Sequence, residues 1–236
     1  IRQDFAEGKI SRDELLKGES NSYHSPGTCT FYGTANSNQM LMEIMGLQLP
    51  GSSFVNPGTE LRTLLNEEIV KVMAEKTRVK KFENGLAVQI DEKVITNAII
   101  GLLSTGGSTN HTIHLIAIAK AAGIIINWQD FSDLSATIPL LTKVYPNGAA
   151  DINHFHAAGG MGFIIHTLLE NKLLHKDVHT ILGFGMDHFT KEPSIKNGQL
   201  ESRNGQKESL NTSILRPATD PFSAEGGLRF LVGNIG

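Results

Sequence analysis

The single cysteine of this chain, Cys29, is the residue whose type and setting point most directly to chemistry. It follows Pro26 and Gly27, which predict a tight loop, and it precedes a helical pattern that starts near residues 34–38. A thiolate placed there can be stabilised by backbone N–H groups and by the positive end of the helix, which suits a metal ligand or a nucleophile. The alternative is a buried, inert cysteine, because free cysteines are among the most buried residues. An iron–sulfur cluster needs several thiolates, so any partner ligands of Cys29 lie outside this sequence.

A glycine-rich segment between two helical patterns is the second candidate. The helical patterns cover residues 94–103 and 111–122, and the segment between them contains Thr105, Gly106, Gly107, Ser108, Thr109 and Asn110. Such residues ahead of a helix can present donors to a phosphate or a carboxylate. The segment is not a Walker A loop, because no Gly-Lys-Ser/Thr follows, and its spacing does not match a dinucleotide fingerprint. A capped turn between two helices explains the same residues equally well, so both interpretations stay open.

Two pairs of histidines could suggest a metal site. His111 and His114 lie three apart on one predicted helix, and His154 and His156 form a His-x-His pair. Neither pair has the His-Glu-x-x-His arrangement of a zinc hydrolase, which argues against metal binding by either. His111, next to the glycine-rich segment, is the one histidine that we expect to touch a substrate.

The elements that must position these residues are mixed. Apolar residues recur at helical spacing over residues 34–46, and again after Thr59, which is a candidate cap for a helix that serves as scaffold. Residues 151–169 are predicted to be helical on either side of a Gly-Gly pair. Short strands are predicted from β-branched runs at residues 124–126, 138–144, 178–182, 213–215 and 228–232.

The same patterns predict an α/β fold and a division into domains. Residues 183–209 are rich in Gly, Asn, Lys, Glu and Ser, and they predict a long surface connection. We therefore expect residues 1–210 to belong to an α/β domain and residues 211–236 to open a second, β-rich domain. The sequence begins at Ile1 without Met and stops just after a strand-like run, so we expect a piece of a longer protein.

Composition narrows the classes of function. The chain has 236 residues, 40% hydrophobic and 19% charged, enough to bury a core. A formal net charge of -3 without a long basic run argues against nucleic acid as a partner. No apolar stretch approaches the roughly 20 residues that span a bilayer, so no membrane partner is expected. One cysteine cannot form an internal disulfide, which favours the reducing cytoplasm.

The segment around Cys29 carries a resemblance to a known family. Residues 25–40, Ser-Pro-Gly-Thr-Cys-Thr-Phe-Tyr-Gly-Thr-Ala-Asn-Ser-Asn-Gln-Met, closely resemble the third cysteine motif of the dihydroxy-acid and 6-phosphogluconate dehydratases. Thr30 and Phe31 look like the phosphogluconate branch, because the other branch typically has Cys-Gly-Gly-Met there. Further similarity spans almost the whole chain, at residues 105–115, 126–128, 145–148, 221–223 and 226–227.

The resemblance implies a dehydratase that converts 6-phosphogluconate, a phosphorylated sugar acid, into 2-keto-3-deoxy-6-phosphogluconate. It implies that Cys29 binds an iron–sulfur cluster, with [4Fe–4S] favoured over [2Fe–2S], and that residues 105–111 orient the substrate. A divalent cation such as Mg²⁺ would be held by residues outside this chain. The other cysteine motifs and the catalytic base are likewise expected outside it, so the fragment alone should be inactive.

The family also implies a homodimer and a fold in which an α/β domain is followed by a C-terminal β-barrel. Two alternatives remain at this point. One is a dehydratase of another sugar acid or of a dihydroxy acid, and the other is a non-enzymatic anion-binding module in which Cys29 is structural.

Overall fold

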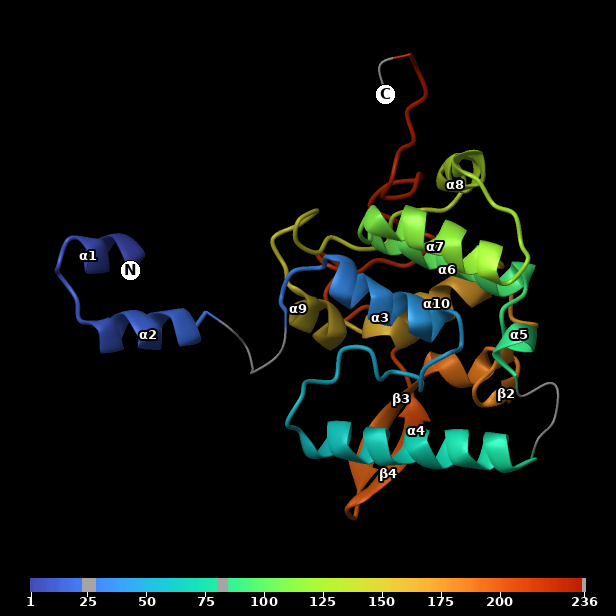
Figure 1. The fold of residues 1–236 in the computed structure, drawn as a ribbon, viewed down its shortest axis with the longest axis horizontal. Helices are drawn as coiled ribbons and strands as arrows, with labels where there is room; N and C mark the ends of the chain where they lie inside the picture. Colours follow the sequence, from blue (N-terminus) through green and yellow to red (C-terminus); the bar gives the residue numbers. More distant parts are fainter. Residues whose placement is uncertain (23–28, 80–84, 235–236) are drawn as a thin grey trace.

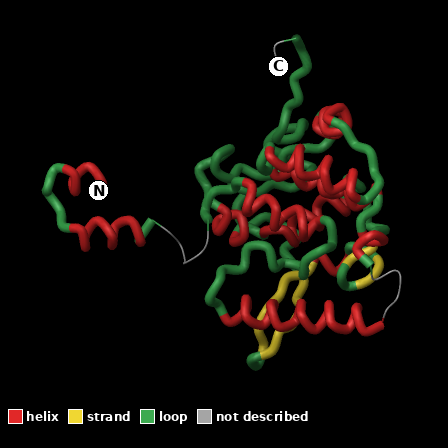
Figure 2. The backbone as a smooth tube through the Cα atoms, in the orientation of Figure 1, coloured by secondary structure: helices red, strands yellow, loops and turns green. Residues whose placement is uncertain are grey.

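The computed structural model describes residues 1–22, 29–79 and 85–234. The tight loop predicted at Pro26 and Gly27 lies outside these residues. Helices dominate, and the short strands form two separate antiparallel hairpins (Figures 1 and 2). In chain order the elements are α1 (Arg2–Ala6), α2 (Arg12–Ser20), α3 (Thr34–Ile44), α4 (Glu60–Val79), α5 (Leu86–Gln89), α6 (Glu92–Thr105), α7 (Asn110–Ala121), α8 (Trp128–Ser135), α9 (Ile152–Ala157), α10 (Gly160–Glu170), β1 (His179–Thr180), β2 (Gly183–Phe184), η2 (Asp187–Thr190), β3 (Lys191–Lys196) and β4 (Gln199–Asn204).

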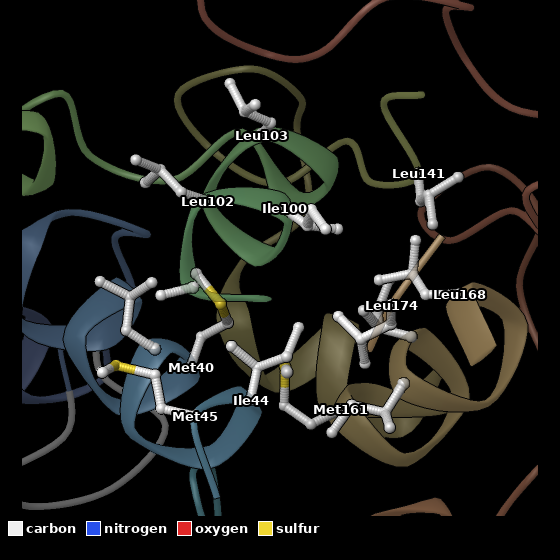
Figure 3. Packing of buried hydrophobic residues seen from close by; sticks show 14 of the residues in the cluster. Met40, Ile44, Met45, Ile100, Leu102, Leu103, Leu141, Met161, Leu168 and Leu174 are labelled. Carbon is white, nitrogen blue, oxygen red and sulfur yellow. The ribbon is translucent and has the colours of Figure 1, made fainter. Parts of the chain in front are cut away.

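Helices α3, α6 and α10 enclose the main core. Their apolar faces supply fully buried side chains such as Met40, Leu102 and Phe163, and Figure 3 shows side chains from all three helices facing one shared interior. Gly101 lets α3 and α6 approach closely, because a Cβ at this position would come within 2.9 Å of the Ile44 side chain. The core therefore fixes α3, which begins five residues after Cys29.

The two helices that flank the glycine-rich segment are confirmed, and each ends on a glycine. Gly106 closes α6 with φ +60°, and the N–H of Gly107 bonds to the carbonyl of Leu102 at 3.0 Å. At the end of α7, Gly123 has φ +80° and the N–H of Ile124 bonds to the carbonyl of Ala119 at 2.8 Å. Both arrangements are Schellman-type helix ends, which use a left-handed residue to satisfy the last carbonyls.

Several predicted strands are absent from the described residues. Residues 124–126 form no strand, because Ile124 completes the end of α7 instead of pairing. Residues 138–144 make only single bridges, from Leu140 to Ser223, from Thr142 to Leu215 and from Val144 to Ala150. The strands predicted at 213–215 and 228–232 are likewise replaced by irregular backbone. In residues 138–144 and 213–215 the β-branched residues are buried in irregular backbone, since Ile138, Val144 and Ile214 belong to the main core, whereas Ile125 and Val232 are exposed.

The prediction that residues 183–209 form a long surface connection is wrong. It contains β2, η2 and a regular hairpin formed by β3 and β4. The pairing of the two strands runs from Lys191 opposite Asn204 to Lys196 opposite Gln199. The turn of this hairpin is Asn197-Gly198, with φ values of 52° and 74°. The predicted strand at 178–182 shrinks to the two residues of β1. Residues 183–204 are thus a folded part of the structure.

Helix α4 rests on the β3–β4 hairpin and forms a second, smaller core (Figure 1). Its buried residues are Leu49, Val55, Leu65 and Ile181, with Leu200 of β4 packed against them. Leu65 is the buried residue of α4, and Met73 is exposed. The first turn of α4 and the loop before it therefore lie between this smaller core and the loop that carries Cys29.

The N-terminal residues form the two short helices α1 and α2. They contact each other and lie apart from the other helices in Figure 2. None of the helices in the described part of the chain is long and apolar enough to cross a membrane.

Candidate functional site

The backbone around Cys29 is held from two sides. The side-chain amide of Asn36, in the first turn of α3, donates to the carbonyls of Cys29 (2.6 Å) and Phe31 (2.8 Å). From the other side, the N–H of Tyr32 bonds to the carbonyl of Tyr145 at 3.1 Å, and the ring of Phe31 packs edge-on against that of Tyr145. The position of Cys29 is thus set by both α3 and the segment that leads into α9.

The thiol of Cys29 is exposed at a hollow of about 330 Å³. Its Sγ makes one weak contact, donating to the carbonyl of Phe31 at 3.8 Å. This placement differs from that of an inert, buried cysteine, because the sulfur is accessible and has no strong hydrogen bond to the described residues. The described residues that line the hollow are Cys29, Ala35, Asn36, Gln39, Ser53, Phe54, Val55, Asn56, Pro57, Arg62 and Ile152.

One wall of the hollow is the loop of residues 51–57, and a buried carboxylate holds this loop in place. Glu43 of α3 is fully buried and accepts hydrogen bonds from the N–H groups of Gly51 (2.6 Å) and Ser53 (3.1 Å), and from the hydroxyl of Ser53. Burial raises the pKa of Glu43 from 4.5 to about 7, although these hydrogen bonds and the nearby Arg62 charge work in the opposite direction. Glu43 therefore couples the core helix α3 to the wall of the hollow.

Arg62, in the first turn of α4, holds the same loop through its carbonyl groups. Its Nε donates to the carbonyl of Val55 at 3.0 Å, and its Nη2 donates to the carbonyl of Ser52 at 2.7 Å. Thr59 caps this end of α4, as the sequence predicts, by accepting a hydrogen bond from the N–H of Arg62 at 3.2 Å. Among the described residues that line the hollow, Arg62 is the only charged one.

The glycine-rich segment 105–110 is not among the described residues that line the hollow. Its polar groups instead bind the start of α3. The hydroxyl of Ser108 lies 2.9 Å from that of Thr34, Asn110 donates to the same Thr34 hydroxyl at 2.7 Å, and the N–H of Ser108 donates to Ser37 at 3.2 Å. The segment and the backbone of Cys29 are thus both held by residues at the start of α3.

Members of the segment differ in accessibility. Thr105, Gly106 and Gly107 are buried, and the Thr105 hydroxyl accepts a hydrogen bond from Tyr32 at 2.9 Å. Thr109 and Asn110 are exposed, and Ser108 is half-buried. A ligand could therefore reach only the second half of the segment.

His111 lies behind this surface. Its ring is 1% exposed, and its Nε2 contacts the Ser37 hydroxyl at 2.8 Å and the Thr34 carbonyl at 3.2 Å. Burial lowers the pKa of His111, which favours the neutral ring. Its Nδ1 is buried without a hydrogen-bond partner in the described structure. These contacts make His111 a link between α7 and the start of α3.

Metal ligands do not gather elsewhere in the described residues. They contain no group of three or more His, Cys, Asp or Glu side chains that could hold a metal ion. In the other histidine pair, His154 takes part in the cap of α9 with Asp151. The described residues therefore offer one thiol beside a polar hollow, and not a complete metal centre.

The chain belongs to the dihydroxy-acid/6-phosphogluconate dehydratase family, whose N-terminal family model matches residues 1–189. Among curated proteins, it is 56% identical over its whole length to a phosphogluconate dehydratase of Pseudomonas aeruginosa and 52% identical to that of Escherichia coli K12. It is 34% identical over 98% of its length to a dihydroxy-acid dehydratase of Clostridium novyi. The chain spans 39% of the length of each of these three relatives.

These findings confirm the resemblance inferred from the Cys29 motif. The higher identity to the two phosphogluconate dehydratases agrees with the branch that Thr30 and Phe31 indicate. The mixed helical structure with small sheets is consistent with the predicted α/β class.

The sequence interpretation missed Glu43 and Arg62. The signal for Glu43 was present: a carboxylate stands in α3 between the apolar residues Leu41, Met42, Ile44 and Met45, where an unpaired charge would be costly. Arg62 carried no comparable signal, because an arginine in the first turn of a helix normally lies in solvent.

Proposed function

We propose that this chain is part of a hydro-lyase that converts 6-phospho-D-gluconate into 2-dehydro-3-deoxy-6-phospho-D-gluconate and water, a step of the Entner–Doudoroff pathway. The observation that carries the proposal is the exposed Sγ of Cys29 at a polar hollow. It is joined by 52–56% identity to phosphogluconate dehydratases along the whole chain.

The reaction requires two kinds of assistance. The proton on C2 is weakly acidic, so a general base must remove it, and the hydroxide on C3 is a poor leaving group, so an acid must take it. Loss of both gives an enol, which becomes the keto acid by moving a proton to C3. We propose that the base comes from a part of the protein outside this chain.

The residues present fit one ligand of an iron–sulfur cluster, proposed as [4Fe–4S]. A cluster is held by several thiolates, and this chain supplies only Cys29, whose sulfur is accessible. Bound there, the cluster would supply Lewis-acid chemistry at the C3 hydroxyl. Asn36 and the contact between Tyr32 and Tyr145 would keep the Cys29 backbone in one position.

Residues 105–111 have a proposed role in orienting the substrate. Ser108, Thr109 and Asn110 are its accessible members, and they stand at the start of α7, where N–H groups favour an anion. Gly106, Gly107, Thr105 and His111 would act from behind by fixing α3 against α7.

The remaining features of the whole protein are also proposals. We propose that residues 1–210 form part of the N-terminal α/β domain and that residues 211–236 lead into a C-terminal β-barrel domain. Ile214 and Leu215 pack into the main core, so the start of this connection would still be anchored in the first domain. A homodimer, a cytoplasmic location and a divalent cation such as Mg²⁺ held elsewhere in the protein complete the proposal.

The test uses the full-length protein, expressed and purified without oxygen. Keto-acid formation is measured from 6-phosphogluconate and from dihydroxyisovalerate, together with bound iron and sulfide, in the wild type and in Cys29→Ser. We expect turnover of the phosphorylated acid alone, with activity and iron both lost in Cys29→Ser. Ser202→Ala, at an exposed position of β4, is the control and should retain both. Activity that persists without Cys29 would show that the cysteine is structural, and turnover of dihydroxyisovalerate alone would assign the other branch.

A further inference from the structure

The hollow beside Cys29 contains a cation, Arg62, to which no carboxylate among the described residues is hydrogen-bonded. All the hydrogen bonds from the Arg62 guanidinium run to backbone carbonyls, those of Ser52 and Val55. The described residues provide no partner for its Nη1 and no ion pair for the group. An arginine side chain stays protonated at physiological pH, so the positive charge at the hollow is permanent.

The nearest acid does not cancel this charge. Glu43 interacts electrostatically with Arg62, but its carboxylate oxygens are occupied by the N–H groups of Gly51 and Ser53 and by the Ser53 hydroxyl. Burial also raises the pKa of Glu43 to about 7, so near neutral pH a large share of Glu43 is uncharged. Arg62 therefore keeps a net positive field toward the hollow.

The bonds to the loop also fix the direction of the guanidinium. Nε and Nη2 face the carbonyls of residues 52 and 55, which leaves the Nη1 side for another group. A planar guanidinium held in this way is suited to an oxyanion, because its N–H groups match the geometry of carboxylate and phosphate. Asn56 and Gln39 add neutral polar groups to the same lining.

We propose that Arg62 binds an oxyanion of the substrate in the hollow that it shares with Cys29. The proposal rests on the function proposed above, in which the substrate carries a carboxylate at C1 and a phosphate at C6. Either group has the chemistry that Arg62 recognises, and the experiment below separates them. Arg62 is thus a binding residue that would place the sugar acid beside the sulfur of Cys29.

The experiment uses the full-length, cluster-loaded protein and three variants. Arg62→Gln removes the charge, and Arg62→Lys keeps the charge but not the planar guanidinium. Asn56→Asp places a competing carboxylate in the hollow and leaves the bonds from Arg62 to the backbone carbonyls intact. Asn66→Asp makes the same change at an exposed position of α4 that is not among the lining residues, and it serves as the control. Steady-state kcat and KM, bound iron, and calorimetric binding are measured with 6-phosphogluconate and with gluconate.

We expect Arg62→Gln and Asn56→Asp to weaken binding of 6-phosphogluconate by about 10- to 100-fold, as for the loss of a charged hydrogen bond, with iron content unchanged. Arg62→Lys should recover part of this loss, and Asn66→Asp should match the wild type. If Arg62 holds the phosphate, gluconate binding will not change; if it holds the carboxylate, both ligands will weaken by the same factor.

Two results would overturn the proposal. One is wild-type affinity for both ligands in Asn56→Asp and in the Arg62 variants that retain iron. The other is a loss of iron in Arg62→Gln with wild-type affinity in Asn56→Asp, which would make Arg62 a support of the loop alone. The proposed function fails separately: if the wild type binds 6-phosphogluconate through Arg62 but does not dehydrate it, the oxyanion site stands and the dehydratase assignment falls.

Discussion

The buried carboxylate of Glu43 makes stability depend on pH in a direction opposite to that of an ordinary paired acid. The substitution Glu43→Gln tests this dependence. It keeps the size of the side chain and one acceptor oxygen for the loop at Gly51 and Ser53, but it removes the titration. The replacement amide NH₂ cannot accept a hydrogen bond, so we also expect a loss of about 1–3 kcal/mol that does not change with pH.

The magnitude follows from the shift of the Glu43 pKa from 4.5 to about 7, which burial causes. Below pH 4.5 the carboxyl is protonated in the folded and unfolded states, and its titration does not affect stability. As the pH rises, the unfolded state loses the proton first, so folding becomes less favourable until the folded state also ionises near pH 7. At about 1.4 kcal/mol per pKa unit, the free energy of unfolding falls by roughly 3 kcal/mol over this window and is then constant.

The assay is denaturant unfolding of the full-length protein, followed by circular dichroism at intervals from pH 4.5 to 8. We expect Glu43→Gln to gain roughly 3 kcal/mol relative to the wild type between the two ends of this range. Glu67→Gln, at an exposed position of α4, should follow the wild type throughout. A constant difference between Glu43→Gln and the wild type would refute the raised pKa. If Glu43→Gln instead loses stability relative to the wild type as the pH rises, Arg62 stabilises the ionised carboxylate more than burial disfavours it.

Two further substitutions test the elements around the site by the same denaturant measurement. Tyr32→Phe removes the hydrogen bond to the Thr105 hydroxyl and should lower the free energy of unfolding by about 1 kcal/mol. The loss is small because Thr105 keeps its own bond to the Gly101 carbonyl. An unchanged unfolding midpoint would show that the tyrosine hydroxyl does not contribute to stability. Asp91→Ala removes the side-chain cap of α6, whose Oδ1 accepts from the N–H of Val94 at 2.8 Å, and should also cost about 1 kcal/mol. Asp91→Asn should recover most of that loss, and equal losses in both variants would argue against a capping role.

Helices could be predicted from the sequence because their signals are local. The patterns at residues 34–46, 94–103 and 111–122 correspond to α3, α6 and α7, and the predicted cap at Thr59 is present. In these segments, apolar spacing and capping residues agree with the tertiary packing, so local and global preferences give one answer.

Strands were predicted poorly because β-branched residues report burial as much as extended pairing. Residues 138–144 are rich in such residues, yet their partners at Leu215 and Ser223 lie far along the chain and provide only single bridges. At residues 191–204 two strands are present that were not predicted, although Asn197-Gly198 is a strong local signal for a two-residue hairpin turn. Polar composition concealed that signal, because one face of the hairpin is exposed.

The candidate site shows where sequence reasoning stops. Cys29 could be selected from its motif, but the hollow beside it is built from α3, the loop of residues 51–57, the start of α4 and Ile152. Glu43 and Arg62 are 19 positions apart, and both act on residues 51–55. No spacing rule links a buried acid inside one helix to an arginine at the start of the next. Their connection follows from the need to satisfy the backbone groups of a loop enclosed between two cores, and it places a permanent cation beside the thiol that the family motif marks.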